Sequence, residues 1–264
     1  MEQNPKSEGK CLFCGKTFAK AGMNRHLKTH LEQKAKTGQP GFSFLLKIEQ
    51  HPRWGKSPYF LSLWVNSEAR MKDVDQFLRD IWLECCGHLS AFRDPQARRS
   101  GGGMWGLFEA DELLEQGKMK EYEKLMEETS GEIPMSRKVK DVFHTDLKLE
   151  YEYDFGSTTA LQLTVVAAFP VKADKKIILL SRNEPAEWLC DLCKTAPATQ
   201  ICAVHIWDED SMFCDKCAKK HAKVCEDFAD YAAMPVVNSP RMGVCAYEGG
   251  VIDQERDGVF VKNV

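Results

Sequence analysis

Cysteine and histidine occur in this chain in pairs whose spacing suits a zinc ion. Zinc prefers four thiolate or imidazole ligands at the corners of a tetrahedron, and a Cys-x2-Cys step on a tight turn supplies two of them. Eight of the eleven cysteines and four of the seven histidines fall into such pairs. We therefore expect metal binding to be the main chemistry of this chain, with Zn(2+) as the cofactor at about three ions per chain.

The first group lies near the start of the chain, in the sequence CLFCGKTFAKAGMNRHLKTH. Its two histidines are at i and i+4, on one face of a helix, so both imidazoles can reach one ion. Phe18 and Met23 stand where a small finger packs its core. The segment resembles a C2H2 zinc finger that is one residue short between these two apolar positions. Its predicted ligands are Cys11, Cys14, His26 and His30.

The basic residues of this finger suit phosphate better than base edges. With His26 as the seventh helical residue, the three base-reading positions fall on Ala19, Gly22 and Arg25. Only the arginine can bond a base, and one finger covers about three base pairs. We expect contact with nucleic acid or a nucleoprotein complex without sequence selection, and a protein-contact surface with solvated lysines is an equal alternative. The predicted nucleic-acid contacts are Lys16, Lys20, Arg25 and Lys28.

The charge distribution supports this interpretation. The net charge is −3, yet residues 1–40 carry eight Lys/Arg against three Asp/Glu, while residues 181–264 carry nine against fourteen. A basic arm on an acidic body can attract phosphate at one end only.

Near the other end, four chelating pairs follow one another in CDLC, CAVH, CDKC and HAKVC. Their regular spacing favours a cross-brace that holds two ions in closed sites, which stabilise folding and do not activate water. We expect this module to contact a protein partner or the central domain. The first predicted set is Cys190, Cys193, Cys214 and Cys217, and the second is Cys202, His205, His221 and Cys225.

Disulfides are the competing use of paired cysteines, and the cellular compartment decides between the two. The start MEQNPKSEGK has no apolar signal segment, and no apolar run approaches the length of a membrane span. We therefore expect a cytoplasmic chain with reduced thiols and no membrane association.

The middle of the chain predicts an α+β domain. GFSFLLKIEQ and SPYFLSLWVN indicate strands, and MKDVDQFLRDIWLECC indicates a helix with one apolar face. LKLEYEYDF alternates apolar and charged residues and turns into LQLTVVAAF, which is typical of an antiparallel hairpin. We expect a central mixed or antiparallel sheet with packed helices, flanked by two small zinc modules. The predicted domains are residues 1–40, 41–185 and 186–264, and the segment NSPRMGVCAYEGG is expected to wrap back over the core.

A family resemblance covers residues 41–181. The helix that ends in Gly87-His88-Leu89, with Phe92 after it, and the later DVFHTDLKLEYEYDFGS resemble the plasmid pRiA4b ORF-three-like domain. The continuation from ILLSRNEP to MPVVNSPRMGVCAYEGG is similar to a zinc-bearing tail of prokaryotic members. The resemblance implies an α+β fold and a prokaryotic setting near mobile elements, without an established activity. Family members follow the YDFG turn with an acidic residue and Trp-x-His, whereas this chain has Ser157, Thr158, Thr159 and Ala160.

We expect this protein not to be an enzyme, and the alternative is a metal-dependent or thiol hydrolase or nuclease. Such a site would use Asp154, His144 or Cys86 in the central domain, with Cys86 paired to His88 or His144 in the thiol version. For Cys85 and Cys245 we expect packing rather than reactivity. An acidic row from Asp146 to Asp154 is better explained as the solvated side of a hairpin than as a magnesium site.

Overall fold

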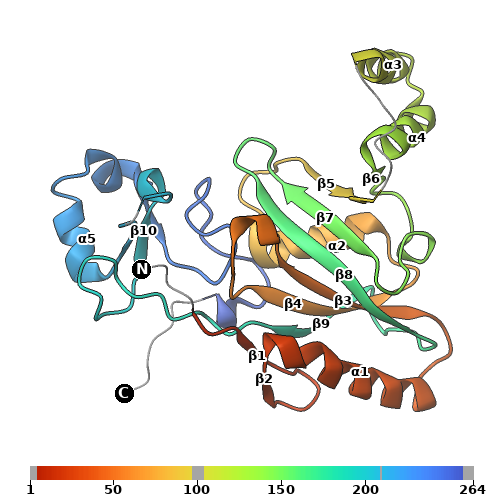
Figure 1. Cartoon of the computed structure of the whole chain (residues 1–264), viewed down its shortest axis with the longest axis horizontal. Coiled ribbons are helices and arrows are strands. Elements are labelled where there is room, and N and C mark those ends of the chain that lie inside the picture. Colours follow the sequence, from red (N-terminus) through yellow and green to blue (C-terminus); the bar gives the residue numbers. More distant parts are fainter. Residues whose placement is uncertain (1–4, 97–103, 209, 258–264) are drawn as a thin grey trace.

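A seven-stranded antiparallel sheet forms the centre of the fold in a computed structural model that describes residues 5–96, 104–208 and 210–257 (Figure 1). The side chains of residues 104–107 and 127–130 are not described. The strand order is β6-β5-β7-β8-β3-β4-β9, which confirms the predicted α+β class. The strands are β3 (Ser43–Gln50), β4 (Phe60–Asn66), β5 (Ser90–Arg93), β6 (Glu132–Ile133), β7 (Lys148–Tyr153), β8 (Thr159–Phe169) and β9 (Ile177–Arg182).

One face of the sheet packs against the helix that the sequence predicts. This helix, α2 (Met71–Leu78), continues into a π-helical turn (η2, Arg79–Leu83). Val74, Leu78 and Trp82 are fully buried against the strands, in a core that includes Leu61 and Leu163. The 3.6-residue spacing of these apolar side chains places them on one helical face, which explains why the segment folds as a core helix.

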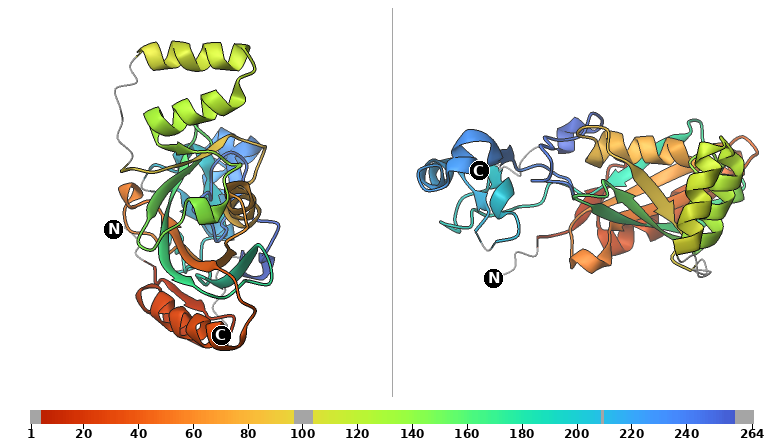
Figure 2. Two further views of the ribbon diagram at one scale, coloured as in Figure 1. Left: turned by 90° about the vertical axis from the view of Figure 1, so that its right-hand side faces the viewer. Right: turned by 90° about the horizontal axis from the view of Figure 1, so that it is seen from above.

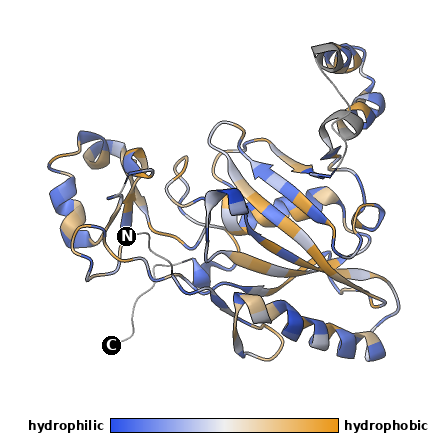
Figure 3. Ribbon diagram, in the orientation of Figure 1, coloured by the Kyte–Doolittle hydropathy of each residue, from blue (hydrophilic) through white to orange (hydrophobic). Residues whose placement is uncertain are grey.

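The other face of the sheet is covered by the helix of the N-terminal finger. This helix, α1 (Lys20–Thr37), begins at Lys20, so His26 is its seventh residue as the sequence predicts. Met23, Leu27 and Leu31 are fully buried and belong to a second apolar cluster with Trp64 of β4. Because α1 and α2 lie on opposite faces, every residue of β4 is buried. Figure 2 shows the resulting three layers, and Figure 3 shows that α1 is largely hydrophilic on its visible side.

The finger hairpin is also joined to the sheet edge through its backbone. Its strands are β1 (Glu8–Lys10) and β2 (Thr17–Ala19), and Gly9 forms a bridge with Asn183, just after β9. A Cβ atom at Gly9 would lie 2.4 Å from the carbonyl oxygen of Arg182, so only glycine permits this approach. The finger is therefore part of the central body.

The C-terminal module has a small sheet of its own, in the order β11-β10-β12. It lies beside the central sheet, away from α3 (Met104–Glu115) and α4 (Met119–Ser130) (Figure 1). Its other elements are β10 (Gln200–Cys202), β11 (Met212–Phe213), α5 (Asp215–His221) and β12 (Ala233–Pro235).

The chain after β12 returns to the central domain, as the sequence predicts. Arg182 is fully buried and bonds Asp257, Asp253 and the carbonyl oxygen of Asn238. Ser239 Oγ donates to the carbonyl oxygen of Trp82 at 2.7 Å. We call residues 236–257 the tail; it covers the end of η2.

The predicted hairpin forms, but its alternation stops two residues earlier than expected. β7 ends at Tyr153, and Asp154 has a left-handed backbone (φ 64°). The turn exposes Phe155 and buries Asp154, which reverses the sides on which the pattern placed them. A buried carboxylate requires a partner, and Arg241 of the tail donates to Asp154 at 2.7 Å.

Candidate metal centres

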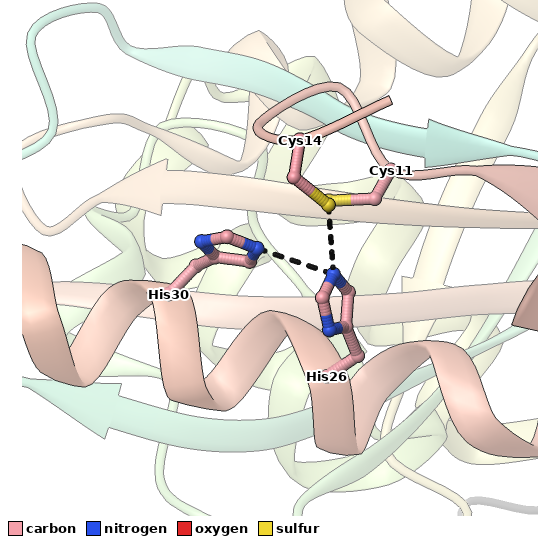
Figure 4. Close-up of side chains that lie close together, drawn as sticks. All are labelled: Cys11, Cys14, His26 and His30. Carbon is pink, nitrogen blue, oxygen red and sulfur yellow. Dashed lines mark hydrogen bonds between the residues drawn. The ribbon is translucent and has the colours of Figure 1, made fainter. Parts of the chain in front are cut away.

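The finger ligands converge on one point. Cys11 and Cys14 lie on the turn between β1 and β2, which Gly15 closes with a left-handed backbone (φ 73°). His26 and His30 project from successive turns of α1 toward this turn (Figure 4). His26 Nε2 lies 3.2 Å from Cys14 Sγ and 3.1 Å from His30 Nε2. A zinc tetrahedron has edges of about 3.3–3.8 Å, so a small adjustment admits an ion.

The surroundings of the finger histidines favour the form that binds metal. Burial, together with the charges of His30 and Lys16, lowers the pKa of His26, so its imidazole is neutral at neutral pH. Phe18 stacks on the His26 ring at a centroid distance of 4.0 Å, and Phe13 lies 5.2 Å from the His30 ring. These contacts fix both rings before an ion arrives.

The first set of the C-terminal module consists of four thiols. Cys190 and Cys193 lie on a turn, while Cys214 caps α5 and Cys217 lies within it. All four sulfur atoms lie within 4.8 Å of one another, and Cys193 Sγ is 3.9 Å from Cys214 Sγ. Burial and the neighbouring thiols raise the pKa of Cys217 to about 12. Four thiolates therefore require a cation between them, and zinc fits this donor set.

The second set of the module combines two thiols and two imidazoles. His205 Nδ1 lies 3.1 Å from Cys202 Sγ and 3.9 Å from Cys225 Sγ. His221 Nε2 is buried and has no hydrogen-bond partner in the described part of the chain. Phe213 stacks on the His221 ring at 4.3 Å. An unpaired buried nitrogen is costly, and an ion at the centre of this set would bind it.

The structure thus groups the ligands of all three predicted sets as their spacing indicates, in a cross-brace at the C-terminal module. The structure shows groups that can hold metal ions, and their identification as zinc sites stays a prediction.

A fourth group was not predicted. Cys85, Cys86, His88 and Cys245 also place one ligand atom each within 4.8 Å of the others. The expected packing of Cys245 is wrong, because this side chain is exposed. Cys85 is half-buried and packs against the core, as expected. The sequence did carry a local signal, Cys-Cys-x-His, but its fourth member lies far along the chain.

The residues of the hydrolase alternative assemble only in part, because Cys86 lies beside His88 and not beside His144. Cys86 and Asp154 both lie near His88, at 2.9 Å and 3.5 Å from its Nε2. His144 instead lines another cavity of about 780 Å³, beside Phe42.

The acidic row of β7 is also engaged in other contacts. Glu150 lies 3.2 Å from His51 Nε2, and Glu152 accepts hydrogen bonds from Arg53 and Arg93. These contacts engage both carboxylates on the sheet surface, as the solvated-hairpin interpretation expects, whereas Asp154 of the same row is buried.

The predicted nucleic-acid contacts differ in their availability. Lys16 and Arg25 are exposed, and Lys28 is half-buried. Lys20 lies 2.9 Å from Glu49 of β3 and donates to the carbonyl oxygen of Ser57, so its charge serves the docking of α1.

Comparisons with known proteins leave the family open. No family model matches this chain, and no curated protein matches it. Among solved structures, it is similar to a protein of unknown function from Methanosarcina mazei Go1. The sequence identity is 15%, the TM-score is 0.35, and the match covers 53% of this chain and 67% of the other. The resemblance to the plasmid family therefore stays a prediction.

No helix among the described residues has both the length and the apolar character that a membrane span requires.

Proposed function

We propose that this protein is a non-enzymatic binding factor, stabilised by zinc, that contacts nucleic acid or a nucleoprotein complex through its N-terminal finger. Zinc fills the three predicted sets. Closed sets of four ligands stabilise a fold and leave no coordination position for a reactive water. The work of such a protein is therefore done by the surfaces that the ions hold in place.

The observation that supports nucleic-acid contact is a group of free cations on the solvent side of the finger. Lys16, Arg25 and Lys28 form no ion pair with any described carboxylate. The helix that carries two of them is anchored by Leu27 and its buried neighbours, so the backbone that presents these two charges is fixed. Unpaired cations bind phosphate and release counterions, which makes binding depend on salt.

Fluorescence anisotropy with labelled single-stranded and double-stranded DNA and RNA tests this proposal. We expect the affinity to fall between about 50 and 200 mM salt. The triple variant Lys16→Ala, Arg25→Ala, Lys28→Ala should reduce the slope of log K against log salt by about 2–3, at about 0.7–0.9 per lost phosphate contact. Its zinc content should be unchanged, because no ligand is altered.

A matched control replaces three exposed lysines outside the finger, Lys118, Lys120 and Lys148. This variant loses the same net charge, so it should keep most of the affinity and slope if the contact is local. An equal loss of affinity in both variants, or an affinity that does not change with salt concentration, would refute the finger as the binding surface.

The C-terminal module is proposed to hold a protein partner. Three large apolar side chains of the module are strongly exposed: Trp207 at 78%, Val224 at 84% and Tyr231 at 68%. Exposed apolar groups on a small rigid module favour protein contact. A cytoplasmic, prokaryotic setting near mobile elements is part of the same proposal and rests on the family resemblance.

A hydrolase is the competing function because Cys86 Sγ and Asp154 Oδ2 lie 2.9 Å and 3.5 Å from His88 Nε2. A nuclease assay with Cys86→Ala and Asp154→Asn separates the two functions. Cleavage by the wild type that both variants lose would favour the hydrolase.

A further inference from the structure

The fourth Cys/His group joins two distant parts of the chain. Cys85, Cys86 and His88 follow the core helix, whereas Cys245 belongs to the tail, 157 positions after His88. We propose that this group binds a thiophilic divalent cation such as Zn(2+), and that the bound ion clamps the tail, and with it the C-terminal module, onto the central domain.

The distances within the group suit a metal tetrahedron. The Sγ atom of Cys86 lies 3.7 Å from that of Cys85 and 3.5 Å from that of Cys245. His88 Nε2 lies 2.9 Å from Cys86 Sγ and 3.2 Å from Cys245 Sγ. Zinc–sulfur bonds of about 2.3 Å give sulfur–sulfur edges of about 3.8 Å, so the sulfur atoms are already nearly in place.

The segment from Cys85 to His88 is held in position by its neighbours. Gly87 has a left-handed backbone (φ 77°), and its N–H donates to Glu84 Oε1 at 2.6 Å. Arg79 Nη2 donates to the carbonyl oxygen of His88 at 2.7 Å. These bonds curl the chain after η2, so that three potential ligands within four residues face one point.

The same geometry argues against a thiol-imidazole catalytic triad. In a triad, one imidazole nitrogen faces the nucleophile and the other faces the carboxylate. Here His88 Nε2 faces Cys86, Cys245 and Asp154 together, at 2.9, 3.2 and 3.5 Å. A single imidazole nitrogen that faces several potential metal-binding atoms is typical of a metal ligand. A proton relay would instead use both nitrogens of the His88 ring.

The charge near the group also suits a thiolate-rich metal site. A divalent ion with three thiolates carries a net negative charge. Arg241 is fully buried, and its Nη2 lies 3.5 Å from Cys85 Sγ and 2.7 Å from Asp154 Oδ2. Its guanidinium is shared between the Asp154 carboxylate and the Cys85 thiol, and it places positive charge on the protein side of the site.

Accessibility distinguishes this site from the first cross-brace set. Cys86 and Cys245 are exposed, while Cys190, Cys214 and Cys217 are buried. A chelator can reach the exposed ligands directly, so this ion should leave before the ion of the first cross-brace set. Its loss would free the tail near Cys245, at the rim of the cavity of about 800 Å³ beside the C-terminal module.

The test uses the full-length protein, loaded with Zn(2+) under reducing conditions and analysed by mass spectrometry of metals. Four occupied groups predict four zinc ions per chain, and Cys245→Ser should hold three. Ala246→Ser is the matched control, because it introduces the same side chain at the next exposed position and should keep four. Cys86→Ala is the second variant and should also hold three.

Hydrogen exchange of residues 239–257 tests the clamp itself. We expect faster exchange in Cys245→Ser, and in the wild type after brief EDTA treatment, with slow exchange retained in Ala246→Ser. A wild type with three zinc ions, an unchanged count in Cys245→Ser, or a Cys86–Cys245 disulfide at three zinc ions would overturn the site. Loss of one ion with unchanged exchange would overturn the clamp.

Neither readout involves nucleic acid, so this inference can fail or succeed independently of the proposed function.

Discussion

The burial of the finger helix against the central sheet predicts that one substitution in the finger destabilises the whole central body. Leu27 is fully buried between α1 and the sheet, in the cluster that includes Trp64 and Leu45. Leu27→Ala removes three carbon atoms and leaves a cavity that both layers line. For such a site the cost is about 2–5 kcal/mol.

We take about 3 kcal/mol as the expected loss in the free energy of unfolding, because the backbone bridge at Gly9 limits how far the finger can collapse into the cavity. At about 2–4 °C per kcal/mol for a body of this size, Tm should fall by about 6–12 °C. Urea unfolding of the zinc-loaded protein, followed by circular dichroism, measures the first quantity, and a thermal scan measures the second.

The control is Gln33→Ala, on the exposed side of the same helix, which should change stability by at most about 0.5 kcal/mol. A finger that folds independently of the central sheet would respond differently to Leu27→Ala. Leu27→Ala would then release the finger zinc and leave the main transition at the wild-type denaturant concentration. That outcome would refute the docked finger.

Two further predictions concern the ion pairs that join the parts of the molecule. Arg182→Ala leaves the buried Asp257 without its charged partner, so it should lower the free energy of unfolding by about 3–5 kcal/mol and speed proteolysis of the tail. Arg256→Ala removes only a half-buried pair with Asp253 and should lower it by about 1 kcal/mol or less. Similar losses in the two variants would contradict this reasoning. At Glu49, burial raises the pKa, but hydrogen bonds from Lys47 and Lys20 outweigh it, so the pKa lies below 4.5. A carboxyl group with a lowered pKa adds stability above its unfolded pKa, and this stability is lost as pH falls through the folded pKa. Urea titrations at pH 7 and pH 3 should therefore show a smaller loss on acidification in Glu49→Gln than in the wild type, by about 0.5–1 kcal/mol; an equal loss would show that Glu49 does not hold α1.

The sequence was sufficient to predict those elements and ligand sets whose residues all lie within a short stretch of chain. The finger set spans one hairpin and one helix, so its spacing alone fixes which side chains meet. The core helix and the strands β3 and β4 follow from local periodicity in the same way. Each of these is decided by residues that are neighbours in the chain.

The docking of the finger on the sheet can also be predicted from the sequence, from the length of the apolar stripe on α1. A small finger needs Phe18 and Met23 for its own core, yet the apolar stripe of α1 continues through Leu27 to Leu31, beyond the metal ligands. β4 offers the complementary surface, because Trp64 alternates with residues of the opposite face. An apolar stripe longer than its module requires indicates burial against another element.

The fourth Cys/His group cannot be predicted from residues that are close in the sequence, and the reason is physical. Three of its members form a dense pattern, Cys-Cys-x-His, but Cys245 reaches them only because the tail returns over η2. That return depends on Arg182, a buried cation whose partners are all in the tail, and on Arg241, whose partner Asp154 turns inward where β7 ends early. Neither pairing has a periodic signature, since the Arg182–Asp257 and Arg241–Asp154 pairs each join residues more than 70 positions apart. The geometry of a metal site between such segments depends on how the tail docks on the central domain. An ion bound there would in turn stabilise this docking.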